Sequence, residues 1–310
     1  MEKAPLYNDM ADGPEGAQAF WLNTEDDIRI RAAHWPGGDK GTVFVFPGRS
    51  EYVEKYGRTA VELKARGFGT ISIDWRGHGL ADRLDPLVTL GHVDRFSDYQ
   101  KDLRAVLAMA AMVNCPKPFY LIAHSMGGCI GLRSLLDGLA VNAVVFSAPL
   151  WGVIMPPVQR SFAWALSWAT HRTRFSRLPT PTTKQESYVL SEPFEGNDLT
   201  TNPEFYAYMQ RHLREHPEMI LGGPSLNWLY ETLRETRALR AITPPPVPTL
   251  TFLGSNERVV DPHAVHQVMD KWPNGALRMV AGARHEVMME TPDIQTDFFD
   301  AAADLFTQHS

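Results

Sequence analysis

The chain has 310 residues, which is enough for one large α/β domain with an insertion, or for two modest domains. Its hydrophobic content of 44% and charged content of 21% are ordinary for a globular protein. The formal net charge of −6 provides no basic field, so we expect no nucleic-acid partner.

The composition also bears on location and on metals. Residues 1–18 lack both the positive region and the apolar region of a signal peptide, and no stretch reaches the roughly 18 apolar residues of a membrane-spanning helix. Cys115 and Cys129 follow no metal-ligand spacing, which suits a reducing compartment or simply two neutral core residues. We therefore expect a cytoplasmic protein, or one held peripherally on the inner membrane face, with no metal and no cofactor.

Strands and helices alternate in the first half of the chain. The period-two pattern of residues 27–35 predicts an antiparallel edge strand, and the continuous apolar run 42–46 predicts a buried strand. Such alternation with short links predicts a parallel sheet with right-handed crossovers. Further strands are expected at 69–74, 118–124 and 141–146, and helices at 52–66, 98–112 and 126–137.

The alternation stops at Trp151 and resumes after the proline-rich residues 244–248. Residues 151–243 contain no strand-like run and are predicted to be helical. The chain then continues with strands at 249–253 and 276–281 and helices at 262–271 and 293–306. We therefore expect an α/β core, formed by residues 1–150 and 244–310, with residues 151–243 inserted as a helical cap.

Residues 123–128, Ala-His-Ser-Met-Gly-Gly, directly follow an apolar strand and precede a helix. This arrangement is typical of a nucleophile elbow, in which a serine occupies a turn so tight that its neighbours two positions away must be small. Ala123 and Gly127 satisfy that requirement. Ser125 is therefore predicted to be the nucleophile of a hydrolase, and a carboxylate nucleophile of the epoxide or haloalkane hydrolase type is excluded.

A serine nucleophile requires a base and an acid that orients the base, and in α/β-hydrolases these follow in the order Ser, acid, His. His285 lies just after the last predicted strand and is the candidate base. Glu257 lies directly beyond the preceding strand and is favoured as the acid. Asp261 remains the alternative, although Asp261 before Pro262 also resembles a helix N-cap.

Backbone N–H groups are expected to stabilise the oxyanion that forms during acyl transfer. The candidates are the N–H of Met126, directly after the nucleophile, and that of Arg49, in the loop after the strand 42–46. Gly48 would let this loop approach the substrate closely.

Several segments resemble bacterial lysophospholipase L2 and the wider monoacylglycerol lipase-like hydrolases. They cover most of residues 15–150 and 245–305, and the stretch 90–99, Leu-Gly-His-Val-Asp-Arg-Phe-Ser-Asp-Tyr, narrows the match to the lysophospholipase L2 branch. The resemblance implies the α/β-hydrolase fold, a triad of Ser125, Glu257 and His285, and Arg49 and Met126 as oxyanion donors. Many relatives carry Asp at the acid position and His-Gly in place of Pro47-Gly48.

The predicted cap is rich in aromatic residues, as expected above a site for an acyl chain, although these rings could equally form a core of its own. Arginines near its apolar stretch could meet a phosphate or an anionic bilayer. Its candidate substrate-binding residues are Trp151, Trp164 and Trp228, together with His92 from the core.

We therefore predict a serine hydrolase that cleaves carboxylic esters of lipid-like substrates, lysophospholipids or monoacylglycerols, through an acyl-enzyme. Two alternatives remain open. The same triad could serve a thioesterase, an amidase or a carbon–carbon bond hydrolase, or the fold could be catalytically idle and bind a lipid or a partner. The oligomeric state is not predicted.

Overall fold

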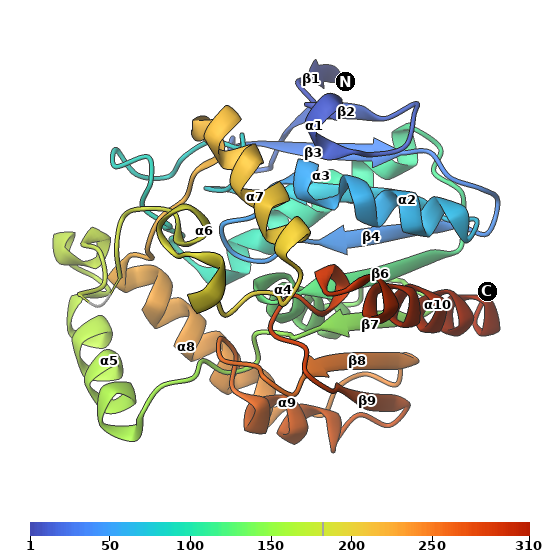
Figure 1. The fold of residues 1–310 in the computed structure, drawn as a ribbon. Coiled ribbons are helices and arrows are strands. Elements are labelled where there is room, and N and C mark those ends of the chain that lie inside the picture. Colours follow the sequence, from blue (N-terminus) through green and yellow to red (C-terminus); the bar gives the residue numbers. More distant parts are fainter. Residues whose placement is uncertain (182) are drawn as a thin grey trace.

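The computed structural model describes residues 1–181 and 183–310. Its central feature is one nine-stranded sheet with the strand order β1-β2-β3-β5-β4-β6-β7-β8-β9 (Figure 1). The strands are β1 (Glu2–Ala4), β2 (Gln18–Asn23), β3 (Arg29–Trp35), β4 (Thr42–Phe46), β5 (Gly69–Asp74), β6 (Phe119–His124), β7 (Val144–Ser147), β8 (Thr249–Gly254) and β9 (Gly275–Val280).

The six strands from β5 to β9 are parallel, as the alternating pattern predicts. β3 is antiparallel to β5, which was also expected, but it is not an edge strand. β2 pairs with the side of β3 that faces away from β5, and β1 pairs with β2. The prediction of an edge position for β3 was therefore wrong. The polar segment 1–18 concealed β1, and β2 was not recognised although it buries Phe20 and Leu22.

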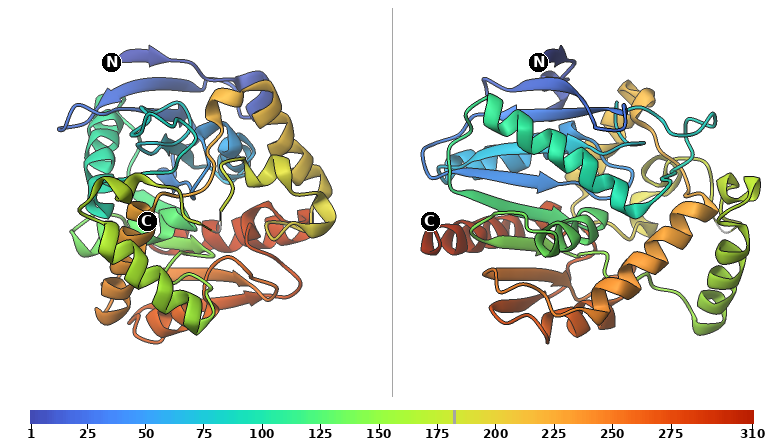
Figure 2. Two further views of the ribbon diagram at one scale, coloured as in Figure 1. Left: turned by 90° about the vertical axis from the view of Figure 1, so that its left-hand side faces the viewer. Right: turned by 180° about the vertical axis from the view of Figure 1, so that it is seen from behind.

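Helices cover both faces of the sheet (Figures 1 and 2). One face is covered by α2 (Gly57–Ala65) and α10 (Pro292–Gln308). The other face is covered by α3 (Tyr99–Met112), α4 (Met126–Leu136), α8 (Leu226–Ala241) and α9 (Pro262–Met269). Because both faces are covered, the central strands β4 and β5 are buried along their whole length.

The insertion between β7 and β8 lies beyond the carboxyl ends of the parallel strands, at the left of Figure 1. It contains α5 (Pro157–Thr170), α6 (Tyr188–Ser191), α7 (Pro203–Glu215) and α8, and the structure assigns no strand to its described residues. Trp228 on α8 packs in the main hydrophobic core rather than in a separate one. The division into a core and a cap of residues 151–243 therefore stays a prediction.

Short helices complete the described chain, and none of its helices combines the length and apolar character needed to cross a membrane. The short helices are α1 (Asn8–Ala11), η1 (Val53–Tyr56), η2 (Phe96–Asp98), η3 (Arg174–Arg177), η4 (Phe194–Gly196), η5 (Pro217–Met219) and η6 (Val287–Met289).

Candidate active site

Ser125 occupies the turn between β6 and α4 in a strained conformation, with φ 49° and ψ −117°. Such a backbone is costly for a residue with a side chain and persists only where its surroundings enforce it. A Cβ added at Gly127 would lie 2.1 Å from the carbonyl oxygen of Phe46, so only glycine fits there. Ala123 is fully buried within β6. The small residues around the serine are therefore required by the turn itself.

His285 lies in the loop after β9 and contacts Glu257 from the loop after β8. The distance from His285 Nδ1 to Glu257 Oε2 is 2.8 Å. The other carboxylate oxygen of Glu257 accepts the N–H groups of Val259 at 2.6 Å and Val260 at 3.1 Å. Burial alone would raise the pKa of Glu257, but His285 and these two N–H groups outweigh it and lower the pKa. Glu257 is therefore ionised at neutral pH.

Asp261, the alternative acid, has different partners. Its carboxylate accepts the N–H of His263 at 3.1 Å and caps α9, with Pro262 at the first helical position. Its second oxygen lies 3.4 Å from an Arg160 nitrogen. These contacts account for Asp261 without a catalytic role.

The loop after β4 carries Arg49 to the same pocket as Ser125. The Trp75 indole N–H holds this loop through the Pro47 carbonyl at 3.1 Å, and Gly48 N–H donates to the Glu51 carboxylate. Met126 is the first residue of α4, where backbone N–H groups have no partner within the helix. Both candidate oxyanion donors thus belong to segments that adjoin Ser125.

Ser125 and His285 line a cavity of about 430 Å³. Most of its wall is apolar, which suits an acyl chain. The apolar lining residues are Leu150, Val153, Val189, Leu199, Met209, Leu213, Trp228 and Val259.

Of the four residues expected to contact substrate, the described pocket wall includes Trp228 alone. Trp151 is buried between Phe146 and Trp272, and its indole N–H donates to the Gly128 carbonyl at 3.2 Å. His92 is also buried, with its ring nitrogens on Ser225 and Asp94. Trp164 packs edge-on against Tyr230. These three side chains have structural partners away from the pocket.

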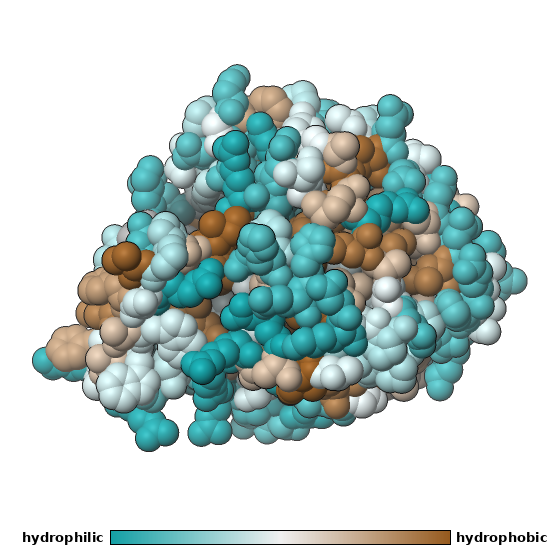
Figure 3. All heavy atoms as spheres, turned by 90° about the horizontal axis from the view of Figure 1, so that it is seen from below, coloured by the Kyte–Doolittle hydropathy of each residue, from teal (hydrophilic) through white to brown (hydrophobic). Residues whose placement is uncertain are grey.

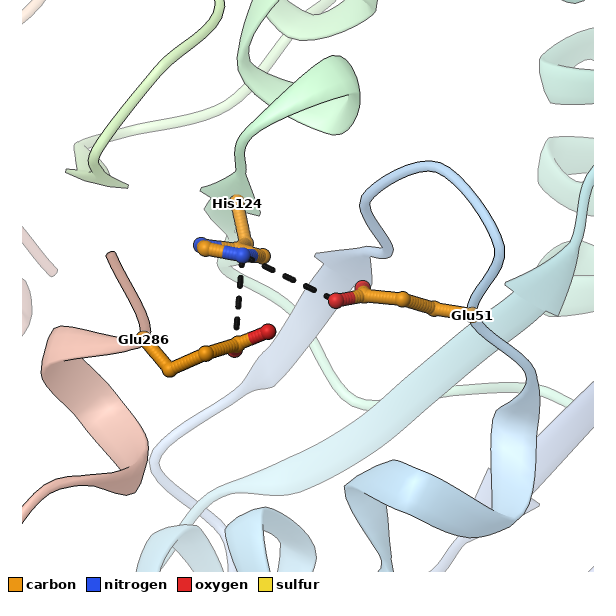
Figure 4. Close-up of side chains that lie close together, drawn as sticks. All are labelled: Glu51, His124 and Glu286. Atoms are coloured by element: carbon orange, nitrogen blue, oxygen red, sulfur yellow. Dashed lines mark ion pairs between the residues drawn. The ribbon is translucent and has the colours of Figure 1, made fainter. Parts of the chain in front are cut away.

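Four buried ionisable residues line the same pocket as Ser125 and His285, and no role was predicted for them from the sequence. Figure 4 shows three of them, Glu51, His124 and Glu286. We call Glu51, Lys55, His124 and Glu286 the buried charge cluster. Lys55 Nζ lies 2.5 Å from Glu51 and 2.6 Å from Glu286. His124 Nε2 lies 3.3 Å from Glu286 and 3.6 Å from Glu51. In the sequence, Glu51 lies in the loop of Arg49, His124 directly precedes Ser125, and Glu286 directly follows His285.

The surroundings of His124 favour its protonated form. Its Nδ1 lies 3.0 Å from the Ser147 carbonyl oxygen, and its Nε2 faces the two carboxylates, so both nitrogens meet acceptors only. Burial lowers the pKa of His124, but Glu286 and Glu51 outweigh burial and raise it. Two basic and two acidic side chains therefore face one another in this cluster. Glu51, His124 and Glu286 lie close enough to hold a metal ion, but the Lys55 ammonium already supplies a cation.

Comparison with known protein families decides where the chain belongs. Residues 37–292 match the model of the family described as serine aminopeptidase, S33. This chain is a member of the S33 family. Its membership confirms the predicted resemblance to α/β-hydrolases and the prediction of an enzyme.

The curated relatives of this S33 member are hydrolases. Lysophospholipase L2 of Escherichia coli (strain K12) is 30% identical over 302 residues, which cover 91% of this chain and 84% of that protein. Monoglyceride lipase of Rattus norvegicus is 25% identical over 264 residues, covering 83% and 79% of the two chains. These relatives confirm the prediction of an ester hydrolase of the lysophospholipase and monoacylglycerol lipase type.

Solved structures confirm the fold. A soluble variant of monoglyceride lipase from Saccharomyces cerevisiae, in complex with a substrate analog, superposes with a TM-score of 0.73 at 19% identity over 94% of this chain and 95% of that one. The monoacylglycerol lipase of Paleococcus ferrophilus gives 0.69 at 19% identity, with 91% and 99% covered. The predicted α/β-hydrolase fold is therefore correct.

Proposed function

We propose that this S33 hydrolase cleaves carboxylic esters of lipids, lysophospholipids or monoacylglycerols, through a triad of Ser125, Glu257 and His285. The observation that carries the proposal is the 2.8 Å contact between His285 and the ionised Glu257, next to a strained serine in a largely apolar pocket. The names of the curated relatives, lysophospholipase L2 and monoglyceride lipase, support the same substrate class.

In the proposed reaction, Ser125 Oγ attacks the acyl carbonyl carbon while His285 takes the serine proton. Glu257 remains ionised and stabilises the imidazolium that forms. The main-chain N–H groups of Arg49 and Met126 stabilise the oxyanion. The carbon–oxygen bond to the alcohol then breaks, and His285 gives the alcohol its proton. Water attacks the acyl-enzyme by the same route, which releases the fatty acid and restores Ser125.

Labelling by a fluorophosphonate tests the nucleophile. The wild type should react, and Ser125→Ala should fail to react and lose roughly 10⁴–10⁶ in turnover of a long-chain ester. Ser134→Ala is the matched control, because Ser134 lies on the same helix, buried and hydrogen-bonded to the Ile130 carbonyl. A wild type that is folded but unreactive would favour the catalytically idle fold. A panel of ester, thioester, amide and carbon–carbon-linked substrates that share one acyl group separates the remaining alternatives.

A further inference from the structure

Arg49 lies on the wall of the active-site pocket, and no carboxylate of residues 1–181 or 183–310 forms an ion pair with it. Its guanidinium donates to the Ser50 hydroxyl at 3.2 Å and to the Gly222 carbonyl, and it lies 5.1 Å from the centre of the Trp228 ring. Its Nε is buried and has no hydrogen-bond partner among the described residues. Burial lowers the pKa of Arg49 to about 10, so the group still carries its charge at neutral pH.

The two most deeply buried arginines of the described residues, Arg31 and Arg76, are neutralised by carboxylates. Arg31 pairs with Glu54 and Asp74, and Arg76 pairs with Asp26 and Asp102. A buried charge without a partner is costly, which explains why such pairs are the usual arrangement. Arg49 lacks such a pair among the described residues, and it lies where substrate would bind.

Arg83 shows what an arginine with a purely structural role looks like in this fold. It too lacks an ion pair among the described residues, but its guanidinium donates to the carbonyl oxygens of Gly77 at 2.6 Å, Gly79 at 2.9 Å and Glu218 at 2.8 Å. Arg83 is absent from the described lining of the active-site pocket. Carbonyl oxygens accept hydrogen bonds from both terminal nitrogens of Arg83, but from only one nitrogen of Arg49 among the described residues.

Two cavities meet at Arg49. The active-site pocket and a neighbouring cavity of about 350 Å³ share Arg49, Ser50 and Tyr188. The neighbouring cavity is more polar, and its lining includes Lys184, Glu186 and Glu192. A lipid ester with its acyl chain in the apolar pocket would place its polar end toward this junction. The mixture of cations and carboxylates suits a head group that carries both charges.

We propose that the Arg49 side chain binds the phosphate of a lysophospholipid head group, and so sets a preference for phosphate-bearing esters over neutral glycerides. The inference rests on the proposed function and extends it. A planar guanidinium matches phosphate oxygens in geometry and charge. Arg49 would then serve twice, with its main-chain N–H on the oxyanion and its side chain on the phosphate. The cap arginines Arg160 and Arg177 are paired with aspartates and do not line the described pocket.

The test compares three substrates with one acyl chain, each as dispersed monomers: lysophosphatidic acid, lysophosphatidylcholine and monoacylglycerol. The measured quantity is the ratio of kcat/KM for each phosphate substrate to kcat/KM for monoacylglycerol. In Arg49→Met both ratios should fall roughly 30- to 100-fold, because a charge-assisted contact with the phosphate is lost. Arg49→Lys keeps the charge but not the planar guanidinium, so its two ratios should lie between those of the wild type and those of Arg49→Met. Arg83→Met is the matched control and should keep both ratios.

Each result has one meaning. Unchanged ratios in Arg49→Met would overturn the inference, including the case in which all three substrates slow equally because Arg49 merely holds Gly222. A fall confined to lysophosphatidylcholine would place the selectivity on choline and overturn the phosphate assignment. If no lipid ester is cleaved and fluorophosphonate does not label the wild type, the proposed function itself has failed.

A binding measurement on the wild type does not depend on how the variants fold. An ether analogue of lysophosphatidylcholine, which cannot be hydrolysed, should slow fluorophosphonate labelling at least tenfold more effectively than the ether analogue of the matching monoacylglycerol. Equal protection by the two analogues would contradict the inference.

Discussion

Glu257 and Asp261 lie four residues apart in the loop after β8, and the sequence offers both as the acid. The distinction depends on which carboxylate the loop turns toward His285, and that direction follows from local hydrogen bonds. Glu257 Oε1 accepts two N–H groups of its own loop, which aims Oε2 at His285. The apolar pattern of strands carries no information about such loop contacts. The proline after Asp261 was the one available signal, because it indicates an N-cap.

Paired substitutions test this assignment. Glu257→Gln should lower kcat/KM for a long-chain ester roughly 10²- to 10⁴-fold, because an amide cannot stabilise the imidazolium or fix its tautomer as a carboxylate does. Asp261→Asn should retain most activity and change the thermal midpoint only slightly, since asparagine is also a good N-cap. Steady-state kinetics and thermal unfolding of both variants provide the comparison. A greater loss of activity in Asp261→Asn would reverse the assignment.

At the scale of elements, the buried parallel strands were the most predictable part. The ranges predicted for β4 and β5 agree with the structure because their apolar runs are uninterrupted and bounded by turn residues. The packing partners of the aromatic side chains were not predictable. Trp151 and Trp228 both lie in the insertion, yet Trp151 packs between Phe146 and Trp272 and Trp228 lines the pocket. Composition indicates that a tryptophan is buried, but not against what.

α5 presents an unusually apolar outer face. Val158, Phe162 and Trp168 are 82%, 63% and 63% exposed. Residues 138–185 contain no aspartate or glutamate, and Arg172 and Arg174, just beyond the helix, are exposed. Seen from below, hydrophobic residues are visible at the left of the molecule, on the side where Figure 1 places α5, as well as elsewhere on this face (Figure 3). An apolar helix face flanked by arginines suits an anionic bilayer, so peripheral membrane contact stays a prediction with this face as its site.

Vesicle binding tests that prediction. The double variant Phe162→Ser with Trp168→Ser should bind vesicles of phosphatidylglycerol and phosphatidylcholine at least roughly tenfold more weakly than the wild type, because two exposed rings no longer enter the interface. Cosedimentation measures the bound fraction. Met112→Ser is the control, since Met112 is 58% exposed on α3, outside the insertion. If the control loses as much binding as the double variant, α5 is not the contact surface.

At the scale of the whole molecule, the buried charge cluster joins loops that are distant in the sequence. Glu51 and Lys55 follow β4, His124 ends β6, and Glu286 follows β9. The ring of His124 also packs on that of His285, with 4.7 Å between centroids. In the sequence, Glu51, Lys55 and Glu286 look like ordinary surface charges. Only the meeting of three strand ends at one edge of the sheet makes them neighbours.

Lys55→Met tests how far this cluster supports the fold. Removal of the ammonium would leave two buried carboxylates near one imidazolium, so the free energy of unfolding at pH 7 should fall by about 3–5 kcal/mol. Urea unfolding with Lys64→Met as the control provides the measurement, because Lys64 is exposed on α2. A variant as stable as this control would show that the cluster contributes little.

The stabilities of the wild type and of Lys55→Met should also depend differently on pH. Burial raises the pKa of Glu286, but Lys55 and His124 outweigh burial and hold the pKa well below its usual range. A carboxylate with a lowered pKa stabilises the fold above about pH 4.5, and that contribution disappears as the pH falls through the folded-state value. The difference in stability between wild type and Lys55→Met should therefore narrow as the pH falls below about 4.5. A difference that is constant from pH 7 to pH 3.5 would contradict this account.

The distance along the chain between Lys55 and Glu286, 231 positions, has a consequence for biosynthesis. A chain emerging from the ribosome presents Lys55 and Glu51 early, Ser125 midway and Glu286 near the end. Contacts between such distant positions form late. We therefore expect the pocket that contains Ser125 and His285 to form late, and a nascent chain to lack hydrolase activity until its last residues have been made.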